Sequence, residues 1–183
     1  LLTLIQTMIS WAVFTPPVLA KQALPEMGLD PAWIAMQPTV LFTAATFSSM
    51  MSAALVARIN PMRASQAMVL LCAVGSAMIA SGNLILVVSG SALIGLGLGP
   101  ATPASSHILS RVAPRELQPL VFSVKQTGVP IGGVLAGLAS PPLMLIWDWQ
   151  IAILIVAGAC LAAAIVSEFW SHGYDRFADP NIK

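Results

Sequence analysis

The chain has 183 residues, of which 57% are hydrophobic and only 8% are charged, and its mean hydropathy is +0.87. A soluble domain is usually about 25% charged, so this composition excludes a soluble globular protein and indicates a polytopic membrane protein. A net charge of +1 without a run of basic residues excludes a nucleic-acid partner. We therefore expect an all-α protein that lies in the lipid bilayer.

Six apolar stretches are long enough to cross a bilayer as helices. They span residues 1–20, 32–57, 64–82, 84–110, 117–145 and 149–170. They predict one six-helix bundle over residues 1–170, after which residues 171–183 begin a loop. The first stretch starts inside an apolar run, so we expect a clipped helix there, with a cleaved signal peptide as the alternative.

Basic residues mark alternate breaks between the predicted helices. They lie at the second break, at the fourth break and after the last helix, namely Arg58 and Arg63, Arg111 and Arg115, and Arg176 and Lys183. Because Lys and Arg concentrate in cytoplasmic loops, this pattern predicts that both chain ends are cytoplasmic.

Polar residues are concentrated in four of the six helices. They are Thr3, Gln6, Thr7 and Ser10 in the first, Thr39, Thr43 and Thr46 in the second, Thr102, Ser105, Ser106 and His107 in the fourth, and Lys125, Gln126 and Thr127 in the fifth. We expect these four helices to surround a polar route, while the third and sixth face lipid. The alternative is that the hydroxyl groups bond to helix carbonyls or hold helices together.

The fifth helix carries a cation on a face of small residues. Lys125, Gly128, Gly132 and Ala136 are spaced at i, i+3, i+7 and i+11, so they share one face. Such a face is typical of contact with other protein or with a water-filled cavity, because lipid is a poor neighbour for a charge. As an ammonium, Lys125 favours an anionic solute. The alternative is that its flexible stem reaches the headgroups.

The remaining titratable residues give weaker predictions. His107 lies near the predicted cytoplasmic mouth, where it either handles protons or is an interfacial histidine satisfied by a carbonyl or water. Gln126 is a solute contact or a tie between helices. The acidic residues all lie in loops or near helix ends. Two His and two Cys residues are too scattered to chelate a metal, so we expect neither a metal nor a cofactor.

Two segments carry a family resemblance: Leu93-Ile-Gly-Leu-Gly-Leu-Gly-Pro-Ala-Thr-Pro-Ala-Ser-Ser-His107 and Phe122-Ser-Val-Lys-Gln-Thr-Gly-Val-Pro-Ile-Gly-Gly133. They resemble the major facilitator superfamily (MFS), in particular the amino-terminal six-helix half of a bacterial member. The resemblance implies a twelve-helix transporter in the bacterial inner (plasma) membrane that works by alternating access and is not an enzyme. It also implies a cytoplasmic gate, for which the candidates are Arg58, Arg63, His107 and Arg111.

The chain departs from the family pattern at two motifs. In the loop between helices two and three, Ala57 stands where the family has an aspartate and Asn60 where it has a glycine, so the charge relay of the gate is in doubt. The family's antiporter motif is Gly-Pro-x-x-Gly-Gly, whereas residues 128–133 read Gly-Val-Pro-Ile-Gly-Gly, so antiport is not assigned.

We therefore predict a fragment of a secondary active transporter for a small polar or anionic solute. Its expected solute contacts are Gln6, Ser10, Lys125 and Gln126, and its expected partner is a missing carboxy-terminal six-helix half. The alternative is a complete six-helix channel or assembly subunit that oligomerises around its polar face, with a second copy in place of the missing half. An intramembrane serine hydrolase is disfavoured, because the sequence has no Gly-x-Ser-x-Gly elbow.

Overall fold

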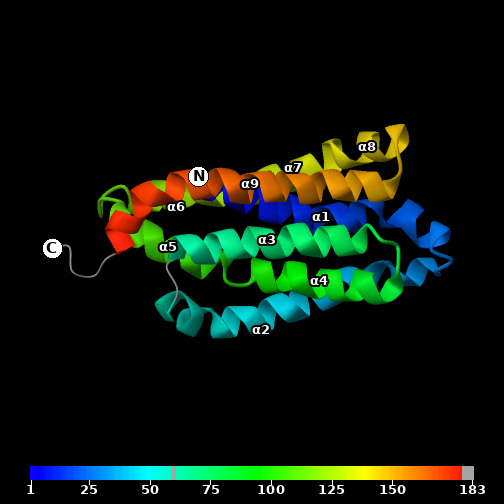
Figure 1. The fold of residues 1–183 in the computed structure, drawn as a ribbon, viewed down its shortest axis with the longest axis horizontal. Helices are drawn as coiled ribbons and strands as arrows, with labels where there is room; N and C mark the ends of the chain where they lie inside the picture. Colours follow the sequence, from blue (N-terminus) through cyan, green and yellow to red (C-terminus); the bar gives the residue numbers. More distant parts are fainter. Residues whose placement is uncertain (59–60, 179–183) are drawn as a thin grey trace.

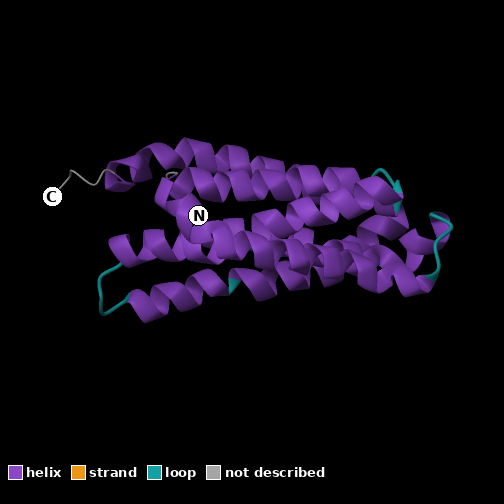
Figure 2. Cartoon of the chain, turned by 90° about the horizontal axis from the view of Figure 1, so that it is seen from below, coloured by secondary structure: helices purple, strands orange, loops and turns teal. Residues whose placement is uncertain are grey.

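The computed structural model describes residues 1–58 and 61–178, and every regular element in these ranges is a helix. Within the helices, the side chains of residues 53–58, 61–62, 104, 107–108, 110–112 and 170–178 lie outside the description. The helices run side by side along one long axis, and their connections gather at the two ends of the bundle (Figures 1 and 2).

Six helical units make up the described part of the chain, and two of them are broken. The first is α1 (Leu2–Glu26), and the 3-10 helix η1 (Pro31–Ala35) leads into the second, α2 (Met36–Arg58). The third is α3 (Pro61–Ile79), and the fourth is divided into α4 (Leu84–Leu98) and α5 (Ala101–Val112). The fifth is divided into α6 (Gln118–Gln126), α7 (Gly128–Leu138) and α8 (Ser140–Ile146), and the sixth is α9 (Trp149–Ala178).

Length and composition make this bundle a membrane structure. Four stretches of the described chain are long and apolar enough to cross a membrane: Leu2–Glu26, Leu84–Pro103, Gln118–Ile146 and Trp149–Phe169. A shorter apolar helix, Arg63–Ile79, lies among them. The all-α, polytopic class expected from the sequence is confirmed.

Proline explains the breaks in the fourth and fifth units. Pro100 separates α4 from α5, and α8 has proline in its first turn. Proline cannot donate the backbone hydrogen bond that continues a helix, so residues 84–110 and 117–145 do not form the single helices that were expected. The first helix instead extends beyond residue 20 to Glu26, because Lys21 and Gln22 are good helix formers although they end the apolar run.

The α3–α4 turn is short and well defined. Gly82 has φ +70°, a left-handed conformation that favours glycine. Asn83 then caps α4, since its side chain accepts hydrogen bonds from the backbone N–H groups of Ile85 and Leu86. The break expected between residues 82 and 84 therefore lies at this turn.

Helix α1 lies at the centre of the packing. It contacts α7 and α9 most extensively, while α3 packs on α4 and α9, and α2 packs on α4. Helices α3 and α9 each bury one face in the core: Met68, Val69, Cys72, Val156 and Cys160 are at most 3% exposed. The expectation that the third and sixth helices face lipid therefore holds for only one face of each, because their other faces pack against each other.

Candidate functional site

The polar face of α1 packs against the small face of α6 and α7. A Cβ at Gly132 would lie 2.5 Å from the Ser10 Cβ, and one at Gly128 would lie 2.9 Å from the Gln6 Cβ. Any residue larger than glycine would force these two helices apart. The predicted packing of this face against protein is confirmed. We name this contact the polar seam, which consists of Gln6, Thr7, Ser10, Lys125, Gly128, Gly132 and Ala136.

The α1 side of the polar seam is closed in this conformation. Gln6, Thr7 and Ser10 are 3%, 6% and 2% exposed. The Thr7 hydroxyl donates to the carbonyl oxygen of Thr3 in its own helix at 2.9 Å. Gln6 and Ser10 thus lie beside the α7 glycines and line no open path here. Their role as solute contacts stays a prediction.

Lys125 is the charged residue of the polar seam. Its side chain is only 4% exposed, although it lies in α6 near the start of a membrane-spanning stretch. Its ammonium Nζ is buried and has no hydrogen-bond partner among the described residues. A buried cation without a partner is unfavourable, so a group with negative charge would be strongly attracted to this position.

Gln126 points away from the polar seam. Its side chain is exposed, whereas that of the preceding Lys125 is buried, because successive helical residues lie about 100° apart around the axis. The structure therefore does not bring Gln126 and Lys125 to one face. The prediction that Gln126 contacts the solute remains open, since its side is available to another partner.

The four predicted gating residues belong to segments at one end of the bundle. Arg63 is exposed in the first turn of α3, and Arg58 is the last residue of α2. His107 and Arg111 lie in α5, which packs on α2 and α3. The side chains of Arg58, His107 and Arg111 are outside the described part, so the gate itself stays a prediction.

Most other hydroxyl groups satisfy their own helices. Thr39, Thr43 and Thr46 of α2 are exposed, and each donates to the carbonyl four residues earlier at 2.7–2.8 Å. Ser105 of α5 does the same towards Ala101 at 2.6 Å. The alternative of bonding to helix carbonyls therefore accounts for the stripe in the second helix.

Several polar contacts between helices were not predicted. The Trp11 indole N–H donates to the Ser140 hydroxyl at 3.3 Å, and Thr15 and Ser140 share a hydrogen bond at 3.2 Å. The Trp149 indole N–H donates to a Glu26 carboxylate oxygen at 2.7 Å. A buried indole needs an acceptor, which is a signal visible in the sequence. The identity of the acceptor depends on which helices are neighbours.

Among the described residues, no three His, Cys, Asp or Glu side chains gather into a cluster that could hold a metal ion. Cys72 and Cys160 are buried free thiols and form no disulfide with each other. Both are part of the core between α3, α9 and α1, as expected for small core residues.

Comparison with known proteins identifies a family. Residues 1–180 match the family model of the Major Facilitator Superfamily. A comparison with curated proteins gave no match. The family match covers every helix described above, including the polar seam.

Proposed function

Because this chain belongs to the Major Facilitator Superfamily, we propose that it is the amino-terminal half of a secondary active transporter for a small anionic or polar solute. Members of this family are transporters rather than enzymes, and the match indicates a multi-pass membrane protein with a transport-type function. The proposal adds the class of solute, the residues that bind it and the missing partner.

The observation that carries the proposal is the buried ammonium of Lys125, which has no hydrogen-bond partner in the described part of the chain. Among the acidic residues whose side chains are described, Glu26, Asp30, Glu116 and Asp148 are exposed at connections and Glu168 accepts a hydrogen bond from Gln66, so none of these five neutralises Lys125. An anionic group that enters beside α6 would supply the missing charge and hydrogen-bond acceptors. The carboxylate or phosphate of a solute has this chemistry.

In an alternating-access cycle we expect the polar seam to open. Gln6 and Ser10 lie one and two turns along the seam from the Lys125 level, so they would become solute contacts when α1 and α6–α7 separate. Proline lies in α1, at the start of α5 and in α6, α7 and α8. Helices interrupted in this way bend more readily than continuous ones, which supports a conformational change at this place.

The partner is proposed from the surface of the fifth unit. Only 17% of an apolar 18-residue window in Gln118–Ile146 is buried within the chain, against 44–56% for the corresponding windows of the other three spanning stretches. Its exposed apolar residues include Leu138, Leu145 and Ile146. We propose that a second six-helix half, or a second copy of this chain, covers part of this surface and that the bilayer covers the rest.

The orientation follows the basic residues. Arg63 and Arg115 are exposed at the end of the bundle where α2 meets α3 and α5 meets α6. We place this end, with both chain termini and the gate formed by Arg58, Arg63, His107 and Arg111, on the cytoplasmic side of a bacterial inner membrane.

The test is solute uptake by the full protein in proteoliposomes. A thermal-stability screen against carboxylates, phosphate and sulfate first selects an anion that stabilises the protein. Lys125→Ala is expected to abolish uptake of that anion, while Lys125→Arg retains part of it and Lys21→Ala leaves it unchanged. Normal uptake by a correctly inserted Lys125→Ala protein would reject the proposed role of Lys125.

A further inference from the structure

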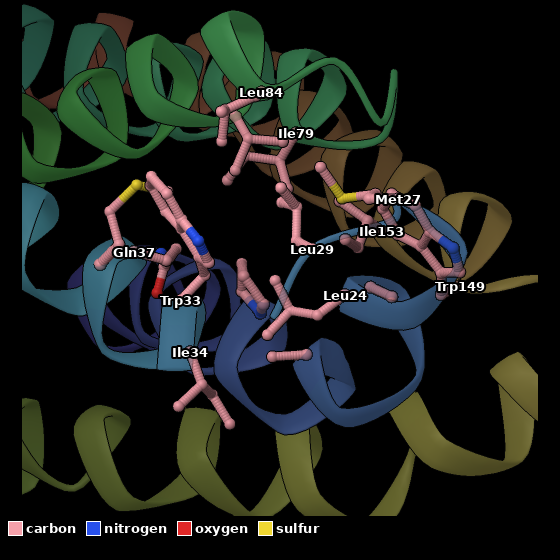
Figure 3. A pocket seen from close by; sticks show the side chains of 15 residues that line it. Leu24, Met27, Leu29, Trp33, Ile34, Gln37, Ile79, Leu84, Trp149 and Ile153 are labelled. Atoms are coloured by element: carbon pink, nitrogen blue, oxygen red, sulfur yellow. The ribbon is translucent and has the colours of Figure 1, made fainter. Parts of the chain in front are cut away.

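A cavity lies at the opposite end of the bundle from Lys125, where the connections α1–α2, α3–α4 and α8–α9 meet (Figures 1 and 3). Its volume is ≈ 50 Å³. One water molecule needs ~10–15 Å³ by the same kind of measure, so the cavity holds about three to five water-sized groups. It goes beyond the proposed transport function, because none of the residues of the polar seam lines it.

The walls of the cavity are almost entirely apolar. They come from the last turns of α1, from the 27–37 connector, from the α3–α4 turn and from the start of α9. Trp33 and Trp149 supply aromatic surface, and Trp149 already donates its indole N–H to Glu26. Bound water needs two to four polar partners, so a cluster of water molecules fits these walls poorly.

Gln37 is the polar exception among the lining side chains. It is the second residue of α2, is 8% exposed, and lies beside Trp33 at the cavity (Figure 3). Neither its amide nitrogen Nε2 nor its amide oxygen Oε1 has a hydrogen-bond partner among the described residues. A primary amide offers two donors and an acceptor, and burying it without partners is unfavourable.

We propose that this cavity binds a small, mainly apolar molecule that carries one hydroxyl group. A hydroxyl is both donor and acceptor, so it can donate to Oε1 of Gln37 or accept from Nε2 while the hydrocarbon part contacts the apolar walls. No Lys, Arg, Asp or Glu side chain lines the cavity, so a charged ligand would find no counter-charge there. A bound molecule would bridge the 27–37 connector and α9.

The test compares two probes of equal size on the full protein in lipid nanodiscs. 3-Bromo-1-propanol and 1-bromobutane differ only in that a hydroxyl replaces a methyl group, and bromine quenches tryptophan fluorescence at short range. We expect saturable quenching, with 3-bromo-1-propanol bound about threefold to tenfold more tightly after correction for lipid partitioning, the effect of one added neutral hydrogen bond. Gln37→Met should remove this preference.

A second variant separates loss of the cavity from loss of the amide. Ala20 lines the cavity, and Ala20→Leu would fill it while leaving Gln37 in place. This variant should lose saturable quenching by both probes, whether or not Gln37→Met folds. Quenching of the wild type that rises without saturation, or equal affinity for the two probes, would overturn the proposal.

Discussion

Two helix contacts of similar closeness differ sharply in chemistry. The polar seam joins α1 to α6–α7 through glycines, hydroxyl and amide groups and one ammonium. The contact between α3 and α9, which we name the apolar seam after its core, buries Met68, Val69, Cys72, Val156 and Cys160, and it carries one side-chain hydrogen bond, from Gln66 to Glu168, where α3 begins. The apolar seam is what close packing alone requires of two membrane helices.

This difference in chemistry shows that stability alone does not explain the residues of the polar seam. Nothing in the packing of α6 requires a cation at position 125. An apolar side chain would avoid the free-energy cost of burying Nζ without a hydrogen-bond partner among the described residues. Local choices that oppose stability are expected at functional sites. The apolar seam is therefore the frame, and the polar seam is the part that we expect to move and to bind.

The largest expected effect comes from filling the polar seam at its tightest point. In Gly132→Leu the new Cβ would meet the Ser10 Cβ at 2.5 Å and the Thr7 carbonyl oxygen at 2.6 Å, and backbone cannot yield as a flexible side chain can. We expect destabilisation of about 3 kcal/mol or more, measured by thermal unfolding in detergent. The matched control is Gly137→Leu, which has no atom within 4 Å of its new Cβ and should be near neutral. Equal effects would mean that the seam is loosely packed.

Removing the charge of the polar seam should act in the opposite direction. Lys125→Met keeps the length of the stem and deletes the buried cation, so we expect it to raise the free energy of unfolding by roughly 1–3 kcal/mol. Lys21→Met, at an exposed position, should change it little. A fall in stability on Lys125→Met would show that Nζ makes a favourable contact that holds the bundle together.

The smallest effect is expected at the tie between α1 and α8. Ser140→Ala removes the acceptor of the Trp11 indole and the partner of Thr15, and should cost about 0.5–1.5 kcal/mol. Ser91→Ala is the control, because Ser91 is equally buried but donates only to Val87 of its own helix. Thermal unfolding of the two variants measures the difference between their losses of stability. Equal losses would show that the Ser140 hydrogen bonds do not stabilise the contact between α1 and α8.

The fold was largely predictable because membrane helices are specified by long apolar runs and by the turn-forming residues that separate them. The breaks expected between residues 82 and 84 and between residues 145 and 149 lie where connections occur. The family resemblance read from residues 93–107 and 122–133 is confirmed by the match over residues 1–180. The shared face of Lys125, Gly128 and Gly132 followed from helical spacing alone.

What the sequence did not reveal depends on which helices are neighbours. The Trp149–Glu26 and Trp11–Ser140 hydrogen bonds join residues that are far apart in the sequence. Gln37 lies at a cavity where several connections meet. The breaks at 99–100, 127 and 139 were also harder to place, because proline within a helix either bends it or ends it. Gln126 lies about 100° around the helix axis from Lys125, so the two side chains face different sides. Because they are adjacent polar residues, the sequence alone suggested one shared site for both.

The most direct test of the central claim asks whether position 125 meets water when α1 and α6–α7 separate. Lys125→Cys and its neighbour Val124→Cys are labelled with the membrane-impermeant reagent MTSES in the full protein; Cys72 and Cys160 are buried and contribute little background. Val124 is 53% exposed on the apolar surface of the fifth unit that we assign to the partner half and the bilayer, whereas Lys125 is 4% exposed in the polar seam. We predict that MTSES labels the Lys125→Cys variant, because α1 and α6–α7 separate even without the ammonium and without solute uptake, and that it does not label the Val124→Cys variant. Labelling of the Val124→Cys variant without labelling of the Lys125→Cys variant would contradict a solute path along the polar seam.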